Sequence, residues 1–312
     1  MGDWTIHGGR LAAARRRWPN VPGPWLDLST GINPHGWPIE RAGPIDWQRL
    51  PDDEALAGLE AAAAAAFGVP ADTVCATPGS EIALRLIATL DLPRPHRFVA
   101  PGYRTHGEAF DDGHAVAPDA IAALDDGTLL LARPANPQGM TWPLPSGDVR
   151  LIVDEAFADA VPHASILPHS DAIVLRSFGK FFGLAGIRLG FVIGPAEILT
   201  QLRRRLGSWP VSSAAIAIGA AAYRDHGWQA DMRDRLAREA AALDRILARH
   251  GLAPEGACPL FRLVRAPDAP LLFERLASRG ILTRPFDHAP DWLRFGLPGS
   301  TDALDRLDQA LG

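Results

Sequence analysis

The sequence predicts an α/β protein whose large domain has a mostly parallel central sheet flanked by helices, followed by a smaller α+β domain. Short apolar runs such as 128–132, 149–153 and 172–175 alternate with stretches of helical periodicity, a pattern typical of parallel sheets. Turn-forming or polar residues follow these runs directly, where open α/β sheets place ligands. A chain of 312 residues, 47% of them hydrophobic, is long enough for more than one core.

The expected elements follow from apolar periodicity and from turn-forming residues. We expect helices at 10–18, 53–67, 81–90, 195–207, 213–250 (interrupted near Gly227) and 270–279, and strands at 26–29, 73–76, 97–100, 128–132, 149–153, 172–175, 189–193, 260–264 and 292–295. The order of these elements predicts three parts of the chain: an N-terminal arm (1–40) that packs with the small domain and the active site, a large domain (41–212), and a linker helix with the small C-terminal domain (213–312).

Composition argues against several classes of protein. The net charge is −5 and the basic residues are scattered, so no nucleic-acid-binding surface is expected. No apolar run reaches the roughly 18 residues of a membrane span. The two cysteines, Cys75 and Cys258, form neither a disulfide framework nor a metal motif, which favours a cytoplasmic protein with no metal site.

The stretch 171–194 (DAIVLRSFGKFFGLAGIRLGFVIG) carries the main chemical signal. Apolar runs on both sides should carry Lys180 into the interior, where desolvation lowers a lysine pKa and frees the amine to form Schiff bases. Ser177 and Arg188 flank it with a hydroxyl and a guanidinium, which suit a phosphate monoester. The combination suggests pyridoxal phosphate (PLP). The alternative is a surface lysine in a glycine-rich loop.

Four further strand ends carry polar or aromatic groups. Gly79 and Ser80 precede a helix N-terminus that suits a phosphate, although Ser80 also fits an ordinary helix cap. Tyr103 can stack on a heterocycle or be a half-buried core residue. Asn136 offers an amide in a tight turn. Asp154 can pair with a protonated pyridine nitrogen or form a structural ion pair. Their convergence, more than any single motif, predicts a ligand across the sheet edge.

Two residues outside these strand ends are candidates for substrate binding. Asn33 precedes Pro34 and should be extended, so that its amide points into a cleft or caps its own turn. Arg294 alternates with apolar residues in a strand, and its planar fork suits a carboxylate if it faces a cleft.

These motifs resemble those of fold-type I PLP-dependent enzymes of the class I/II aminotransferase superfamily. SFGKFFGLAGIRLGF (177–191), RPANPQG (133–139) and DEAF (154–157) are similar to its lysine, asparagine and aspartate segments. The resemblance implies a covalent bond from PLP to Lys180, with Asp154 at the pyridine nitrogen, Asn136 at the ring hydroxyl and Tyr103 stacked on the ring. The remaining cofactor-binding positions it implies are Gly79, Ser80, Glu81, Phe157, Ser177 and Arg188, while Arg294 would bind the substrate carboxylate.

Within the superfamily the chain is most similar to L-threonine-O-3-phosphate decarboxylases of cobalamin biosynthesis, and next to histidinol-phosphate aminotransferases. The similarity rests on His7-Gly8-Gly9, on LSTGINPHGWP (28–38), on Phe157 and on RRRLGSWPVSSAA (203–215). It implies a PLP-dependent lyase that makes (R)-1-amino-2-propanol O-2-phosphate; the alternative is an aminotransferase of the histidinol-phosphate type. We expect His7, Gly8 and Asn33 to meet the substrate phosphate.

The chain departs from the family pattern at two positions. Leu50 replaces a tyrosine whose hydroxyl reaches the cofactor phosphate across the dimer, and Phe157 cannot donate to the ring oxygen. Each lost charge-assisted bond would matter by about 1.5–3 kcal/mol. The resemblance also implies a homodimer.

Overall fold

The computed structural model describes residues 4–168 and 171–312, which form two compact units. Unit 1 contains the chain up to His35, Pro137–Met140 and Met232–Gly312, and unit 2 contains Gly36–Asn136 and Thr141–Asp231. The division into three domains that the sequence predicts is not tested by these two units and stays a prediction. The first three residues of the expected N-terminal arm lie outside the described residues.

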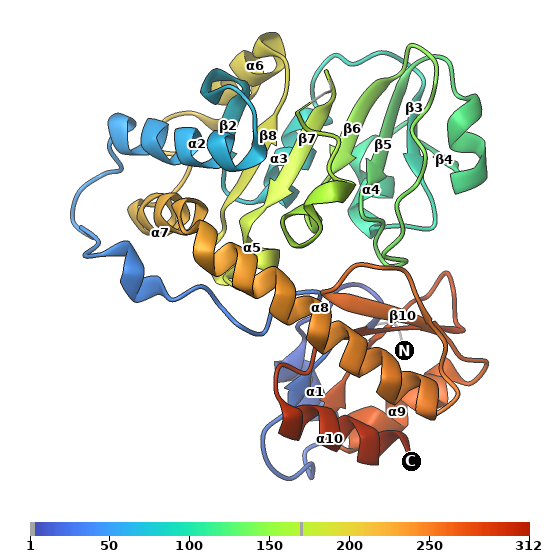
Figure 1. Cartoon of the computed structure of the whole chain (residues 1–312). Coiled ribbons are helices and arrows are strands. Elements are labelled where there is room, and N and C mark those ends of the chain that lie inside the picture. The colour runs from blue at the N-terminus through green and yellow to red at the C-terminus, as the bar shows by residue number, and fades with distance from the viewer. Residues whose placement is uncertain (1–3, 169–170) are drawn as a thin grey trace. The chain divides into compact units, whose positions relative to one another are not determined.

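Unit 2 is built on a seven-stranded sheet (Figure 1). Its spatial order is β2 (Val74–Thr77), β8 (Gly190–Ile193), β7 (Ile173–Ser177), β6 (Arg150–Asp154), β5 (Thr128–Ala132), β3 (His96–Val99) and β4 (His114–Val116). All strands run parallel except β8, which is antiparallel to both β2 and β7. The mostly parallel sheet expected from the sequence is confirmed, and the start of β8 lies at the edge where the other strands end.

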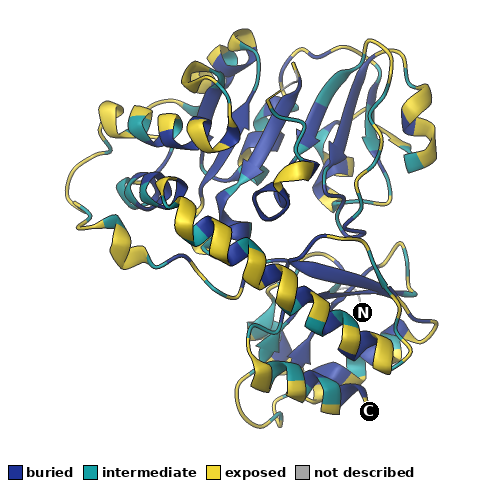
Figure 2. Cartoon of the chain, viewed as in Figure 1, coloured by how far each residue is buried: buried dark blue, intermediate teal, exposed yellow. Residues whose placement is uncertain are grey.

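Helices flank this sheet. They are α2 (Asp53–Phe67), α3 (Ser80–Ile87), α4 (Arg104–Ala109), α5 (Phe178–Phe181), α6 (Ala196–Leu206) and α7 (Ser213–Arg224), with short 3-10 turns at Ile39–Ala42, Ala71–Thr73, Pro118–Ala123, Ala158–Ala160, Pro162–Ala164 and Ala185–Ile187. Residues of α3 and α6 pack with the central strands in one apolar cluster, and β5 is buried along its whole length (Figure 2). Burial on both faces explains the continuous apolar runs of these strands.

Unit 1 contains a four-stranded antiparallel sheet and a two-stranded parallel pair. The larger sheet has the order β12 (Arg284–Pro285), β13 (Trp292–Gly296), β10 (Phe261–Arg265) and β9 (Pro254–Glu255), and β1 (Leu26–Asp27) pairs with β11 (Ile281–Leu282). Its helices are α1 (Leu11–Arg17), α9 (Ala269–Ser278), α10 (Thr301–Leu311) and most of α8 (His226–Arg249).

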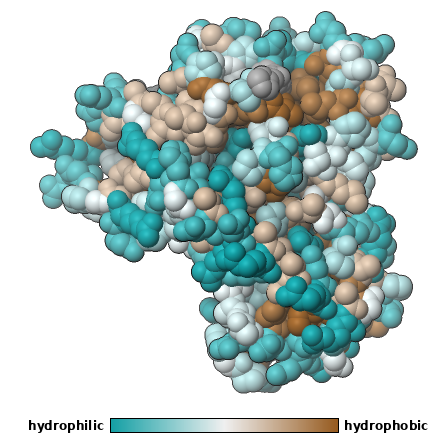
Figure 3. Space-filling view, viewed as in Figure 1, coloured by the Kyte–Doolittle hydropathy of each residue, from teal (hydrophilic) through white to brown (hydrophobic). Residues whose placement is uncertain are grey.

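The helical stretch expected at 213–250 is two helices, and the interruption expected near Gly227 is confirmed, with the break at Asp225. The Asp225 carboxylate accepts a hydrogen bond from the Trp228 amide at 3.2 Å and so caps the start of α8. Hydrophilic residues cover the outward side of α8 (Figure 3). No helix within the described ranges has the length and apolar character needed to cross a bilayer.

Candidate active site

The ten residues predicted to bind the cofactor all belong to unit 2 and gather around one edge of its sheet. Asp154 ends β6 and Ser177 ends β7, while Gly79 follows β2 closely. Because β8 runs against its neighbours, Arg188, two residues before it, lies at the same edge. The antiparallel β8 therefore brings a cation to the place where parallel strands supply hydroxyl and carboxylate groups.

Two glycines allow a close approach of backbone and guanidinium at this edge. Gly79 has φ +96°, and a Cβ atom there would lie 2.5 Å from Arg188 Nη2. A Cβ atom at Gly190 would lie 2.5 Å from the Ser80 nitrogen. The Arg188 guanidinium thus lies beside the start of α3, whose first amides lack helical partners and suit an anion.

Asp154 is held by two donors. Its Oδ2 is 3.1 Å from His106 Nε2, and its Oδ1 accepts a bond from the Ala156 amide at 3.0 Å. His106 is 1% exposed on α4, three residues after Tyr103, and their rings meet edge to face with centroids 5.6 Å apart. The sequence interpretation missed His106; its only signal was this spacing, which places both residues on one side of α4.

Tyr103 is fixed by Glu81. The Tyr103 hydroxyl donates to Glu81 Oε2 at 3.1 Å, and the Thr105 hydroxyl donates to Oε1 at the same distance. Burial, reinforced by the Glu81 carboxylate, raises the pKa of Tyr103 to about 12, so the hydroxyl keeps its proton as a donor. Glu81 therefore fixes the orientation of the Tyr103 hydroxyl.

Lys180 lies in the short helix α5 directly after β7 and is half-buried, less enclosed than the sequence predicted. Its Nζ lies 5.8 Å from the centre of the buried Phe157 ring. It is also the only lysine in the sequence, in which every other basic side chain besides histidine is an arginine. Asn136 is half-buried four residues after β5. The site thus has one primary amine in its side chains.

The four candidate substrate-binding residues belong to unit 1. Arg294 is 6% exposed on β13 and its Nη2 donates to the Ser29 carbonyl at 3.0 Å. A Cβ atom at Gly8 would lie 2.3 Å from that carbonyl oxygen. The structure therefore brings Gly8 and Arg294 together around Ser29. His7 is exposed, and Asn33 is buried with its Oδ1 accepting a bond from the His35 amide at 2.9 Å, as the turn-capping alternative requires.

A second arginine, which sequence reasoning did not identify, lies near Arg294. Burial, together with the Arg284 charge, lowers the pKa of Arg294 to about 9, so its guanidinium stays charged at neutral pH. Arg284 donates to the carbonyl oxygens of Trp4, Thr5 and Ile6 at 2.9–3.0 Å. Two buried cations beside the N-terminal arm favour an anionic ligand.

The chain matches a known family and known proteins over most of its length. The family described as Aminotransferase class I and II matches residues 99–311. A threonine-phosphate decarboxylase from Pseudomonas aeruginosa is 39% identical, with 98% of this chain and 96% of that protein covered. A threonine-phosphate decarboxylase from a Sinorhizobium species is 36% identical, with 100% and 98% covered.

The fold is also found among solved structures. The crystal structure of histidinol-phosphate aminotransferase from Sinorhizobium meliloti in complex with pyridoxal-5′-phosphate superposes with a TM-score of 0.80 at 22% identity, covering 96% of this chain and 93% of that one. The prediction of the fold-type I architecture is thereby confirmed. The chain belongs to the class I and II aminotransferase family.

Proposed function

We propose that this protein is a PLP-dependent lyase that decarboxylates L-threonine O-3-phosphate to (R)-1-amino-2-propanol O-2-phosphate in cobalamin biosynthesis. The observation that carries the proposal is the full-length similarity to two threonine-phosphate decarboxylases at 39% and 36% identity. The strand-end residues of unit 2 supply the chemistry that such an enzyme needs.

The residues present fit the cofactor. The glycine contacts at Gly79 and Gly190 bring the Arg188 guanidinium and the first amides of α3 to one place, which suits the phosphate together with Ser177. Asp154, held by His106, suits the pyridine nitrogen. Tyr103 would stack on the ring, Asn136 would bond the ring hydroxyl and Phe157 would line it. Lys180 would bind the aldehyde carbon covalently.

The reaction divides between the cofactor and the chain. PLP supplies an electron sink for the electron pair left when a bond to Cα breaks. The Asp154 carboxylate would keep a proton on the ring nitrogen, and two hydrogen bonds fix the orientation of this carboxylate. Arg294 would bind the carboxylate of the substrate. Lys180, once protonated to the ammonium form, would be the candidate acid that delivers a proton to Cα.

The substrate phosphate would meet the N-terminal arm, around His7, Gly8 and Asn33. The ties from Arg284 to the arm carbonyls and from Arg294 to Ser29 support this proposal, because they hold the arm beside buried positive charge. His7→Ala should raise KM for threonine phosphate; an unchanged KM would exclude His7 from this role.

A homodimer is part of the proposal. Large apolar side chains are exposed at Trp47, Leu50 and Trp209, with Trp47 77% exposed. The Ser213 hydroxyl donates to the Arg49 carbonyl at 3.5 Å, which brings the segment with Trp47 and Leu50 close to the segment that follows Trp209, and exposed apolar side chains of this kind suit a contact between proteins. A second copy of the chain is the proposed partner in this contact. We also propose a cytoplasmic location, since both buried cysteines are free thiols.

The deciding experiment supplies PLP-loaded protein with L-threonine phosphate and no 2-oxo acid, and follows CO₂. Repeated turnover establishes the decarboxylase. If no CO₂ forms and histidinol phosphate converts bound PLP to pyridoxamine phosphate stoichiometrically, the protein is an aminotransferase of the histidinol-phosphate type.

A further inference from the structure

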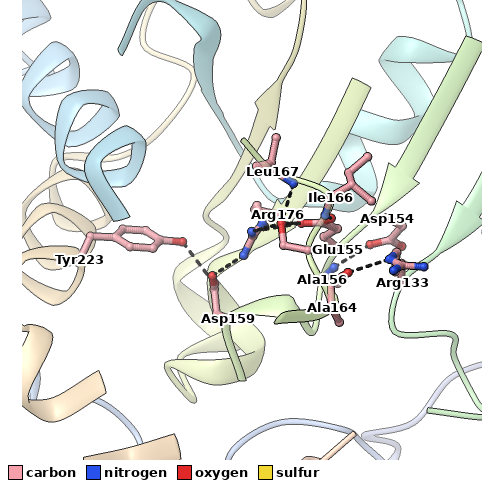
Figure 4. A network of polar contacts seen from close by, with 11 residues as sticks. Arg133, Asp154, Glu155, Ala156, Asp159, Ala164, Ile166, Leu167, Arg176 and Tyr223 are labelled. Carbon is pink, nitrogen blue, oxygen red and sulfur yellow. Dashed lines mark hydrogen bonds and ion pairs between the residues drawn. The ribbon is translucent and has the colours of Figure 1, made fainter. Parts of the chain in front are cut away.

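A buried ionic network lies in unit 2 directly beside the cofactor residues (Figure 4). The Arg176 guanidinium on β7 bonds two carboxylates, Glu155 Oε2 at 3.0 Å and Asp159 Oδ1 at 2.7 Å. It also donates to the Ser165 hydroxyl oxygen at 2.9 Å, and Ser165 in turn donates to Glu155 at 2.7 Å. Arg176, Ser165 and Glu155 form a closed ring of charge-assisted hydrogen bonds, and Asp159 bonds Arg176 from outside this ring.

The network is almost fully enclosed. Glu155 is 0% exposed, Arg176 4% and Asp159 7%. Burial raises the pKa of Glu155, against the opposing effect of the Arg176 charge. The Arg176 guanidinium also lies over the Phe67 ring, 4.7 Å from its centre. Ions held this deep in a protein give little net stability compared with apolar side chains, so their presence calls for another reason.

Glu155 and Arg176, which form one ion pair of the network, are each next in sequence to a residue expected to bind the cofactor. Glu155 follows Asp154, and Arg176 precedes Ser177 and comes four residues before Lys180. Side chains alternate along a strand, so Arg176 and Ser177 leave β7 on opposite faces. The Glu155 amide donates to the Leu175 carbonyl at 2.9 Å, which keeps the ends of β6 and β7 paired. The ion pair thus ties together the two strand ends that carry the expected proton holder and the expected Schiff-base lysine.

The network also holds the segment after β6. Glu155 Oε1 accepts a bond from the Ile166 amide at 2.7 Å, and the Leu167 amide donates to the Ser165 hydroxyl at 3.1 Å. The Tyr223 hydroxyl donates to Asp159 Oδ2 at 3.5 Å. Phe157 lies within this segment, whose two ends these contacts tie together.

We propose that Arg176, clamped between Glu155 and Asp159, is a positioning residue for the cofactor: it sets the relative position of the Asp154 carboxylate and the Lys180 amine. It touches neither group and acts through the strand ends. The proposal rests on the proposed function, because the bound group is PLP.

The test compares Arg176→Met with a matched control. Arg262 on β10 of unit 1 is also a buried strand arginine, 7% exposed and bonded to both carboxylate oxygens of Asp244, and Arg262→Met removes an ion pair whose carboxylate side chain is 36% exposed. Urea denaturation of the apoproteins measures the stability lost by each variant. Absorbance titration measures PLP affinity, and borohydride trapping with peptide mapping measures covalent attachment at Lys180.

We expect both variants to lose stability, but only Arg176→Met to bind PLP more weakly. The expected loss is about 10- to 100-fold, the range seen when residues that orient the direct ligands of a bound metal are replaced. Trapping at Lys180 should slow in parallel. Arg176→Met with the affinity and trapping rate of the wild type, or an equal loss of affinity in Arg262→Met, would overturn the proposal.

Milder variants cover the case in which Arg176→Met does not fold. Asp159→Asn and Glu155→Gln each remove one charge and keep the side-chain size, and each should weaken PLP binding in the same direction. Wild-type affinity in both would equally refute the positioning role. If the wild-type protein itself takes up no PLP, the proposed function fails; if it does and the variants match it, only this inference fails.

Discussion

Gly190→Ala should weaken cofactor binding through the backbone alone. A Cβ atom at Gly190 would lie 2.5 Å from the Ser80 nitrogen, 2.8 Å from the Gly79 carbonyl carbon and 2.9 Å from the Arg176 carbonyl oxygen. All three are backbone atoms, so no side-chain rotation relieves the contact. Overpacking of this kind costs about 1–3 kcal/mol. If the strain is relieved by moving the Gly79–Ser80 turn, PLP affinity falls by about 5- to 150-fold, at 1.4 kcal/mol per factor of ten.

The same strand provides the control. A Cβ atom at Gly194, directly after β8, would lie 3.5 Å from the Ala172 carbonyl oxygen and 3.6 Å from Ile173 Cα, which are ordinary contacts. Gly194→Ala should therefore keep wild-type affinity and gain up to about 1 kcal/mol of stability from the less flexible unfolded chain. Urea denaturation and absorbance titration measure both quantities. Equal PLP affinities for the two variants would refute the packing argument.

Three further predictions concern single side chains. Burial raises the pKa of Glu155 above its ordinary value of 4.5. Just above pH 4.5 the folded protein therefore keeps a proton that the unfolded chain has lost. The free energy of unfolding falls as the pH rises from 4.5 through the pKa of Glu155 in the folded protein. Urea titrations from pH 4 to 7 should show a flatter profile for Glu155→Gln; matching profiles would contradict this. Arg294→Met should raise KM for L-threonine phosphate by about 10- to 100-fold, as expected for the loss of one charge-assisted hydrogen bond, with the spectrum of bound PLP unchanged; a wild-type KM in initial-rate assays would exclude this role. His106→Leu should weaken PLP binding by about tenfold, because Asp154 loses one donor, and His106→Asn should restore part of it; equilibrium dialysis that finds wild-type affinity in His106→Leu would refute the role.

The sequence was sufficient to predict those structural features that one short segment determines by itself. The apolar run at 128–132 is a strand buried at every residue, because both faces of the sheet are covered. Asp154 was expected at a strand end because it follows the apolar run at 149–153, and it ends β6 there. The alanine-rich helix expected at 53–67 is confirmed as α2, and Gly68 after it adopts the left-handed conformation, with φ 71°.

Structural features that depend on pairing between segments distant in the chain could not be predicted from the sequence. The residues of β8 predict a strand, but nothing in them shows that it lies between β2 and β7 and runs against both. The contact between His106 and Asp154 joins residues 48 positions apart and gives no local pattern. β4 was missed because its three residues are mostly exposed. α10 was missed although Ser300 caps it, so that signal was present and not used.

A chain with a single lysine has a practical property. Guanidinium groups carry the surface charge without offering a nucleophile to aldehydes or activated esters, so Lys180 is the only side chain at which such reagents form stable amine adducts. Non-specific reaction with free aldehydes, which modifies many side chains in lysine-rich proteins, is confined here to Lys180 and a terminal amine. Once the constant contribution of the terminal amine is subtracted, an amine-reactive dye therefore reports how much of the protein has an accessible Lys180, without mutagenesis.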